Sequence, residues 1–414
     1  MTKEQIKLLV REKLHSKRII LFGAGIVAEE FYQEYKDCLQ ISHCISNLSK
    51  EWGEKTFLGE LDVRQYKQEE LQENDYLVVC GPIAFRSIEL QLEAAGMKMY
   101  ENYVESKIAS VILQNKKIAL FYGQCILRDM YHCIVQIPMF QSEYASIYTQ
   151  VVPGQAIVTN RLLYYAKELC DLYVYTPKIL DHDSVYVVKR NELPADCQII
   201  SISNLVVSLY WPQVSPKLRD YNEYYLYPYN IKRDVIFGHT LYRRQDRNIN
   251  KMVLENLPTK EIVERLSDED YYSEKQILKN RNIFLKSIAL AEKGVDITIL
   301  DYIRDNYESV PLYQNFVHSN ACIILEYIRR LLQKLELPIT ELNSLEEKLP
   351  ELMHHGGDVP IYPSVIKHLK LKFANAETKY EVMIGNGIVS MTFREYMEHF
   401  TEYTRKTIEV SRML

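Results

Sequence analysis

The sequence has no Cys-x-x-Cys pair, no long apolar segment and no excess of basic residues, and each absence excludes a class of protein. Its eight cysteines lack the spacing of zinc ribbons and thioredoxin-like redox motifs. No uninterrupted apolar run is long enough to span a bilayer, which argues against an integral membrane protein. The net charge of −5 argues against a dedicated nucleic-acid-binding protein, because such proteins usually carry a basic face.

What the sequence does contain is typical of an intracellular globular protein. Residues 1–17, MTKEQIKLLVREKLHSK, are too charged for a secretory signal peptide. Cysteines such as Cys80 in DYLVVCG lie inside apolar runs, where a thiol acts as a small buried hydrophobe. We therefore expect a cytoplasmic protein with free thiols. The 414 residues are enough for two or three domains with sizeable cores.

A glycine turn near residue 23 is the first pattern with chemical content. In KRIILFGAGIVAEEFYQEY, an apolar run leads to Gly23-Ala24-Gly25, and helical periodicity follows. This is the setting of a phosphate-binding loop: Gly23 permits a tight turn, and Gly25 lets the backbone approach a phosphate at the helix N-terminus. Ala28 is the third small position, where helix meets strand. A ligand site and a turn kept only for packing are equally compatible with this pattern.

Further strands are expected in QISHCISN and NDYLVVCG, and a helix in RSIELQLEAAG ends at Gly96. The alternation predicts a Rossmann-like domain with a parallel sheet over residues 1–112. A dinucleotide site would place an acidic residue after the second strand, where this chain has Ser46 and Asn47, so hydride transfer is disfavoured. The segment resembles the small N-terminal domain of acyltransferases that modify nucleotide-linked sugars. That resemblance implies that the glycine loop faces a nucleotide-sugar.

The strand–turn–helix pattern restarts at Lys116. In KKIALFYGQC, an apolar run leads to Gly123-Gln124-Cys125, and a helical pattern follows directly. SIYTQVV, DLYVYTP and CQIISIS are predicted strands and NRLLYYAKEL a predicted helix, so we expect a second α/β layer structure. Beyond VIFGHT the chain is predicted to be mainly helical, with helices in SEKQILKNRNIFLKSIALAEKG, capped by Ser273, and in NACIILEYIRRLLQKL.

Cys125 stands at the junction of the predicted strand and helix. A side chain on such a turn points out over the carboxyl end of the sheet, as a nucleophile does on a strand–turn–helix elbow. The free N–H groups and the dipole of the helix favour a thiolate there, and the same N–H groups can receive an oxyanion. Because many cysteines near helix starts are inert, spacing alone favours the inert interpretation.

FYGQC and its helix resemble the Gly-Asn-Cys-Gln signature of the WcbI-type family of capsular-polysaccharide acyltransferases. Further matching stretches occur in the family's order: SISNLVVSLYWPQ, GVDITILDYIRDNYESVPLYQNFVHSNACIILEYIRRLL, PIYPSVIKHLKLKF and MTFREYMEHF. The resemblance covers about residues 115–405. It implies a second domain over residues 113–414, an α/β fold related to the SGNH hydrolases with a helical C-terminal part.

The signature carries over residue by residue. Gly123 matches the family's first glycine, and Cys125 matches its cysteine. Gln124 stands in place of asparagine and keeps an amide donor, whereas Ile126 stands in place of glutamine and cannot donate. The resemblance implies transfer of an acyl group, expected to be acetyl, from coenzyme A to a sugar hydroxyl in capsule or other surface-polysaccharide biosynthesis. The expected partners are thus a small-molecule acyl donor (acetyl-coenzyme A) and a sugar or nucleotide-sugar acceptor, and a homo-oligomer is left open.

A cysteine nucleophile needs a nearby base, and His318 in NFVHSNACIIL is the first choice. It precedes a predicted helix that Ser319 or Asn320 would cap, and it falls in the family's histidine block. The alternative is a surface histidine beside a cap. His239 in VIFGHT is the second candidate base. Asn204, which ends a predicted strand, is expected either to hydrogen-bond a substrate carbonyl or sugar hydroxyl or to form a turn.

Arg243 and Arg244 in LYRRQDRNINK are candidates for binding the phosphates of coenzyme A or a sugar nucleotide, because guanidinium groups have forked donors. A solvated charged stretch is the alternative. No metal site is expected, since the adjacent His354 and His355 have no further ligands at suitable spacing. Two other functions remain compatible with the sequence: an SGNH-type glycan esterase that uses water as acceptor, and a non-catalytic binding module in a polysaccharide pathway.

Overall fold

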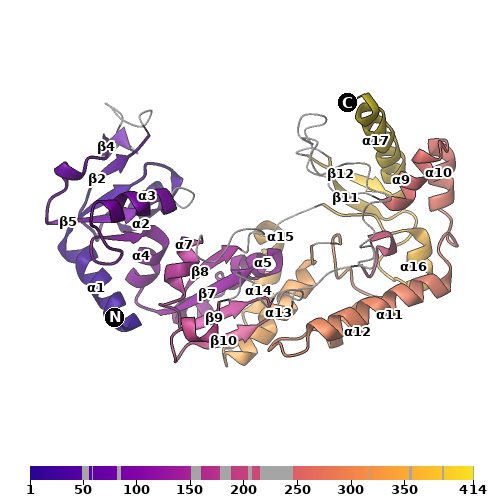
Figure 1. Cartoon of the computed structure of the whole chain (residues 1–414). Helices are drawn as coiled ribbons and strands as arrows, with labels where there is room; N and C mark the ends of the chain where they lie inside the picture. The colour runs from indigo at the N-terminus through magenta and orange to yellow at the C-terminus, as the bar shows by residue number, and fades with distance from the viewer. Residues whose placement is uncertain are drawn as a thin grey trace. The chain divides into compact units, whose positions relative to one another are not determined.

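The computed structural model describes residues 1–48, 56–57, 59–81, 85–150, 160–177, 188–203, 208–214, 246–316, 318–353, 357–384 and 387–413. By its internal contacts the chain divides into two units, Met1–Ser201 and Ile202–Leu414, whose elements are labelled in Figure 1. The predicted α/β class is confirmed, because helices alternate with strands and the two larger sheets are parallel except at one edge.

The first sheet of the first unit has the order β3-β4-β2-β1-β5-β6. Its strands are β1 (Arg18–Phe22), β2 (Ile41–Ser46), β3 (Thr56–Phe57), β4 (Leu61–Gln65), β5 (Asp75–Val79) and β6 (Tyr103–Glu105). Only the β3–β4 pairing in this sheet is antiparallel. The chain passes from β1 to β2 on one side and returns to β5 on the other. Such a switch point leaves a crevice at the carboxyl ends of β1 and β5.

Helices cover both faces of this sheet, as expected for a Rossmann-like domain. They are α1 (Lys3–Ser16), α2 (Ile26–Tyr35), α3 (Phe85–Ala94) and α4 (Ser106–Leu113). Side chains of α1, α2 and α4 pack on the face that holds Ile19 and Leu21. Side chains of α3 pack on the opposite face, which holds Ile20 and Phe22. Alternate strand residues point to opposite faces, so burial on both sides requires the unbroken apolar run that β1 has.

The second sheet is fully parallel and has the order β10-β9-β7-β8. Its strands are β7 (Lys117–Gly123), β8 (Tyr144–Gln150), β9 (Leu172–Tyr175) and β10 (Gln198–Ser201), and the accompanying helices are α5 (Cys125–Ile134), α6 (Pro138–Glu143) and α7 (Arg161–Ala166). The chain passes from β7 to β8 and then crosses back to β9. The switch point therefore lies between β7 and β9.

The two sheets share one hydrophobic core. Helix α4 contacts β6 of the first sheet and β8 of the second. Its buried Ile108, Ala109 and Ile112 belong to the same cluster as Ile118 and Leu120 of β7. The first sheet gives way to the second at the end of α4, where the boundary between domains 1–112 and 113–414 is predicted. That division remains a prediction.

A buried ion pair also joins the two sheets. Arg161, the first residue of α7, donates two hydrogen bonds of 2.6 and 2.5 Å to Glu89 of α3, whose side chain is fully buried. Tyr165 and Arg86 donate to the same carboxylate. Burial acts to raise the pKa of Glu89, but these donors outweigh it and hold the pKa below its usual range. The carboxylate is therefore charged and fully engaged.

The second unit is mainly helical, as predicted. Its helices are α9 (Arg247–Leu254), α10 (Thr259–Leu266), α11 (Glu274–Ala291), α12 (Leu300–Asn306), α13 (Ala321–Lys334), α14 (Leu342–Glu346), α15 (Leu349–Leu352), α16 (Pro363–Leu369) and α17 (Phe393–Met413). Ser273 caps α11, and Gln276 completes a capping box. No helix in the described part of the chain is long and apolar enough to cross a membrane.

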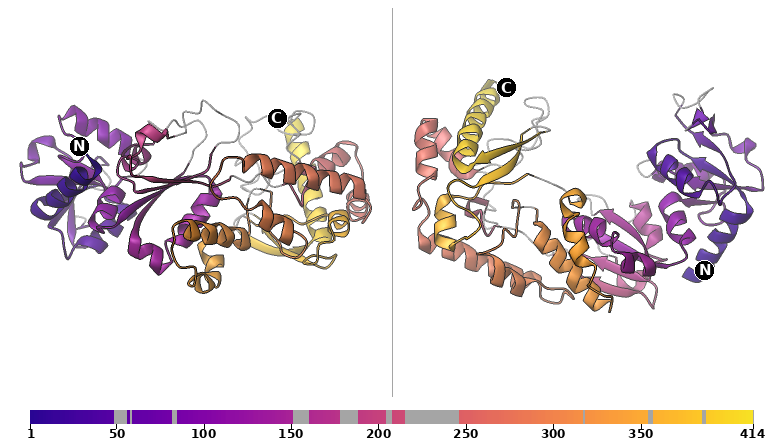
Figure 2. Two further views of the ribbon diagram at one scale, coloured as in Figure 1. Left: turned by 90° about the horizontal axis from the view of Figure 1, so that it is seen from below. Right: turned by 180° about the vertical axis from the view of Figure 1, so that it is seen from behind.

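An antiparallel hairpin interrupts this helical unit and was not expected from the sequence. It consists of β11 (Lys379–Ile384) and β12 (Gly387–Thr392). Helix α17 packs against the hairpin and also against α9 and α10, an arrangement visible from behind in Figure 2. This contact gives an otherwise isolated two-stranded sheet the support that it needs.

Candidate functional site

Cys125 is the first residue of a helix that follows a buried parallel strand. Strand β7 ends at Gly123, Gln124 is the N-cap in an extended conformation, and α5 begins at Cys125. The strand and helix fall where the sequence predicts them. The turn lies at the carboxyl edge of the second sheet, beside the switch point between β7 and β9, which is where open α/β sheets bind ligands.

Gly123 is required here by space. A Cβ at this position would lie 2.5 Å from Leu127 Cδ1 and 2.7 Å from Thr176 Oγ1. Thr176 follows β9 directly, and its N–H donates to the carbonyl oxygen of Tyr122. The glycine thus lets the two strands and the helix approach closely at the switch point. Sequence reasoning identified Gly123 but not Thr176, because the neighbour of β7 lies about fifty residues further along the chain.

The Cys125 thiol is free and half-buried. Tyr148 of β8 lies beside it and donates its hydroxyl to the Gly123 carbonyl oxygen at 3.3 Å. Tyr131 of α5 stacks on the Tyr148 ring, with centroids 5.6 Å apart. Burial raises the pKa of Tyr148, and the neighbouring Cys125 adds to the rise. Tyr148 therefore remains a protonated donor that braces the turn.

The first turn of α5 offers backbone N–H donors. The side chain of Gln124 caps none of the helix N–H groups, and Ile126 is apolar and buried. The N–H groups of Leu127 and Arg128 already donate to the Gln124 carbonyl oxygen. The N–H groups of Cys125 and Ile126 are thus those available to a developing oxyanion, because the first N–H groups of a helix have no partner within it.

The Gly23-Ala24-Gly25 turn occupies the switch point of the first sheet. Gly23 has φ +122°, and a Cβ there would lie 3.1 Å from the Cys80 carbonyl oxygen, so this position also requires glycine. A Cβ on Gly25, the N-cap of α2, would meet no atom of the described residues within 4 Å. The described part of the chain therefore leaves room beside Gly25. Ala28 is completely buried where α2 meets the sheet.

The end of β2 carries Ser46 and Asn47, where a dinucleotide site would place an acidic residue. The Asn47 side chain donates to Gln91 Oε1 of α3 at 2.7 Å. Ile26 directly follows the glycine turn and is 73% exposed, and Leu48 lies just after β2 and is 52% exposed. Ligand binding at Gly23 and Gly25 stays a prediction.

His318 is held in a braced loop of the second unit. It is buried, and its N–H donates to Asn315 Oδ1 at 3.0 Å, while its carbonyl oxygen accepts from the N–H of Gln314. Asn315 in turn donates to the Gly357 carbonyl oxygen at 2.9 Å. Asn320, rather than Ser319, caps α13. Because Cys125 and His318 belong to different units, their approach to one another stays a prediction.

The remaining candidates cannot be placed. Asn204, His239, Arg243 and Arg244 lie outside the described residues, as do His354 and His355. Their roles stay predictions. Within the described ranges, no group of three or more His, Cys, Asp or Glu side chains is arranged to hold a metal ion.

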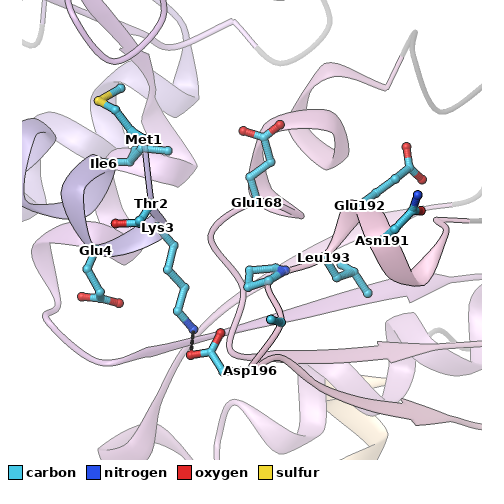
Figure 3. A pocket seen from close by; sticks show the side chains of 12 residues that line it. Met1, Thr2, Lys3, Glu4, Ile6, Glu168, Asn191, Glu192, Leu193 and Asp196 are labelled. Atoms are coloured by element: carbon cyan, nitrogen blue, oxygen red, sulfur yellow. Dashed lines mark ion pairs between the residues drawn. The ribbon is translucent and has the colours of Figure 1, made fainter.

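A cavity of about 620 Å³ lies elsewhere in the first unit (Figure 3). It is lined by Met1, Thr2, Lys3, Glu4, Ile6, Glu168, Asn191, Glu192, Leu193, Pro194, Ala195 and Asp196. Asp196 lies just before β10, at the amino edge of the sheet, whereas Cys125 lies at the carboxyl edge. Because all four strands are parallel, the two edges are opposite, and this cavity is not the predicted acyl-transfer site.

Comparison with known proteins identifies a shared fold. No protein-family model matches the sequence, and no curated protein matches it. Among solved structures, the chain is similar to WcbI, described as a polysaccharide biosynthesis enzyme, in its native form without a disulfide bond between coenzyme A and one of its cysteines. The similarity has a TM-score of 0.51 at 15% sequence identity and covers 72% of this chain and 93% of WcbI. Each unit contains only about half of the chain, so the match draws residues from both.

Proposed function

We propose that this protein transfers an acyl group, acetyl in the first instance, from coenzyme A to a sugar hydroxyl during surface-polysaccharide biosynthesis. The observation that carries the proposal is the half-buried thiol of Cys125, placed on the first residue of a helix at the switch point of a parallel sheet. The fold shared with WcbI, a polysaccharide biosynthesis enzyme whose description mentions coenzyme A, supports the choice of donor and pathway.

In the first form of the mechanism, Cys125 is the nucleophile. Its thiolate attacks the thioester carbonyl, the bond to the coenzyme A sulfur breaks, and the acyl group is held as a thioester on Cys125. The sugar hydroxyl then attacks this thioester, its proton passes to His318, and the Cys125 thiolate leaves. Backbone N–H groups of Cys125 and Ile126 stabilise the negative oxygen in both steps.

In the second form, the sugar hydroxyl attacks coenzyme A thioester directly. His318 accepts the hydroxyl proton, the coenzyme A thiolate leaves, and Cys125 only shapes the site. The glycine turn of the first sheet has the same part in both forms. Open space beside Gly25 and the N-terminus of α2 suit the phosphates of a nucleotide-linked sugar, which would present the acceptor.

Intact-protein mass spectrometry tests the proposal, first with acetyl-coenzyme A alone and then after addition of an acceptor glycan. The covalent form predicts an acetyl adduct on Cys125 that disappears when the acceptor is added. Acetyl transfer without any adduct supports the direct form. Acetate release from a model ester without coenzyme A would instead indicate an esterase. Full pathway function in a Cys125→Ala, His318→Ala double variant would indicate a non-catalytic binding module.

A further inference from the structure

Two cysteines lie against each other at the amino edge of the second sheet, far from the turn at Cys125. Cys170 shortly precedes β9, Cys197 directly precedes β10, and their Sγ atoms are 3.5 Å apart. The parallel register pairs Leu172 with Gln198, so the segments before the two strands lie side by side. The two sulfurs lie in contact there although 26 residues separate the cysteines in the sequence.

The two thiols differ chemically. Each thiol has a carbonyl oxygen within reach besides the other sulfur: that of Lys167 lies 3.2 Å from Cys170 Sγ, and that of Gln198 lies 3.5 Å from Cys197 Sγ. The hydrogen bond from Cys170 lowers the pKa of Cys197 despite its burial, and the charges of Arg190 and Lys3 contribute. The same contact, with burial added, raises the pKa of Cys170. Cys197 is therefore the more readily ionised and more nucleophilic partner.

Lys3 forms ion pairs with the sequence neighbours of both cysteines. Its ammonium group lies 2.5 Å from Asp171, which follows Cys170, and 2.8 Å from Asp196, which precedes Cys197; the second ion pair is drawn in Figure 3. The Asp196 side chain is 69% exposed and lines the cavity of about 620 Å³. The cavity thus reaches the residue before Cys197, whereas Cys197 itself is 5% exposed and Cys170 is fully buried.

We propose that Cys170 and Cys197 form a modification site, which becomes an intramolecular disulfide by exchange with a small-molecule disulfide of the glutathione type. This site is independent of the acyl-transfer proposal. It lies at the opposite edge of the sheet from Cys125 and uses neither Cys125 nor His318.

The exchange proceeds in two balanced steps. The Cys197 thiolate attacks one sulfur of the small disulfide, whose S–S bond breaks, giving a mixed disulfide on Cys197 and one released thiolate. Cys170 then loses its proton and attacks the Cys197 sulfur, which releases the second small thiol. The two protein thiols are oxidised and the small disulfide is reduced to two thiols. Side-chain rotation must bring the sulfurs from 3.5 Å to about 2 Å.

The disulfide would link the edge strand β10 covalently to β9. Among the described strands, β9 is the neighbour of β10, and their ladder holds this edge strand in the sheet. A bond between Cys170 and Cys197 closes the chain between the two strands and removes unfolded conformations in which the strands are far apart. Oxidised protein is expected to unfold at a higher temperature than reduced protein.

Treatment of the full-length protein with oxidised glutathione tests the proposal. After native incubation, acid quenching, alkylation with N-ethylmaleimide and proteolysis, mass spectrometry should find the Cys170 and Cys197 peptides joined, with two hydrogens lost. A phosphine should reverse the link. Cys170→Ser should stop at glutathione on Cys197, and Cys197→Ser should leave Cys170 unmodified.

Cys44→Ser is the matched control, because Cys44 of β2 is a solitary buried thiol whose pKa burial raises to about 12. It should leave the cross-link unchanged. The proposal is overturned if both thiols of the wild-type protein stay reduced while Cys125 becomes fully glutathionylated, or if Cys197 joins a different cysteine. Either result comes from the wild-type chain, so it decides the matter even if a serine variant fails to fold.

Discussion

The turn after β1 and the turn after β7 begin alike and end differently. In each turn, a glycine at the end of a buried parallel strand lies against the residue that directly follows the neighbouring strand at a switch point. Gly23 lies against Cys80, which follows β5, and Gly123 lies against Thr176, which follows β9. In the first turn the helix begins three residues after the glycine, in the second only two.

That one-residue difference changes what stands at the helix N-terminus. In the first turn the cap is Gly25, whose Cβ position has no atom of the described residues within 4 Å, and the first helical residue is Ile26. In the second turn the cap is Gln124 and the first helical residue is Cys125, a half-buried thiol. Both turns aim helix N–H groups at the carboxyl edge of a sheet, but the first is suited to binding an anion and the second to reacting with an electrophile.

The largest expected effect is on chemistry at the second turn. Under the covalent mechanism, Cys125→Ala should lower the acetyl-transfer rate by about a thousandfold, because the nucleophile is lost. Steady-state assays with acetyl-coenzyme A measure it. Cys133→Ala is the matched control: Cys133 lies on the same helix, and burial raises its pKa to about 12, so it stays neutral. Retained activity in Cys125→Ala would contradict covalent catalysis.

The next effect is on the ion pair that joins the two sheets. Arg161→Met should lower the free energy of unfolding by about 3 kcal/mol, because it leaves the buried carboxylate of Glu89 without its main partner. Denaturant unfolding at neutral pH measures it. Arg86→Met should cost under about 1 kcal/mol, since Arg86 reaches the same carboxylate from a 47% exposed position.

A double variant sharpens this test. Arg161→Met combined with Glu89→Leu removes both charges, so it should be more stable than Arg161→Met alone. Equal losses in the single and double variants would mean that the destabilisation comes from packing around Arg161 rather than from an unpaired carboxylate.

The same substitution in the two turns probes their difference in space. Gly123→Ser should destabilise the protein by about 2 kcal/mol, because its Cβ would overlap Leu127 and Thr176. Gly25→Ser should change stability by less than about 0.5 kcal/mol, because serine is a good N-cap and no atom of the described residues lies within 4 Å of the Cβ position. It should nevertheless weaken binding of a nucleotide-sugar. Thermal unfolding with and without that ligand measures both effects. Equal losses of stability in Gly123→Ser and Gly25→Ser would contradict the predicted difference in space between the two turns.

The last prediction concerns pH. Burial raises the pKa of Glu105, at the end of β6, to about 7. The folded state then keeps a proton that the unfolded state loses above about pH 4.5, so stability should fall as pH rises through this window to about 7. Glu105→Gln should flatten that dependence and gain about 1 kcal/mol at pH 8, since its amide oxygen can still accept from the N–H groups of Lys107 and Ile108.

Unfolding curves at pH 5, 6, 7 and 8 compare wild type with this variant. Glu101→Gln, at an exposed position of the preceding turn, is the control and should follow wild type. A wild-type curve that is flat from pH 5 to 8 would mean that Glu105 is ionised throughout.

Apolar periodicity predicted the elements that are buried on both sides. The runs before Gly23 and Gly123 are strands because burial on two faces demands consecutive apolar residues. Some strands with exposed residues were missed, although β8, whose residues alternate between buried and partly exposed, was predicted. β4 alternates buried and exposed residues within a charged stretch, and the hairpin of β11 and β12 was signalled only by Asn386-Gly387 between two alternating runs.

The candidate site was only partly predictable. The position of Cys125 follows from local order, strand then turn then helix, which the sequence displays directly. Its neighbours Thr176 and Tyr148 belong to strands that reach β7 through crossover connections, so no local pattern points to them. The contact between Cys170 and Cys197 was missed for the same reason, since it depends on the register of β9 and β10.

The sequence by itself determined the α/β class, the two glycine turns and the placement of a cysteine at a helix start, because these depend on neighbouring residues. The tertiary structure decided which side chains surround each turn, that the two sheets share a core through α4, and that the cavity lies at the opposite edge from Cys125. Parallel strands pair over long chain separations, and that pairing is set by the packing of the whole unit rather than by local periodicity.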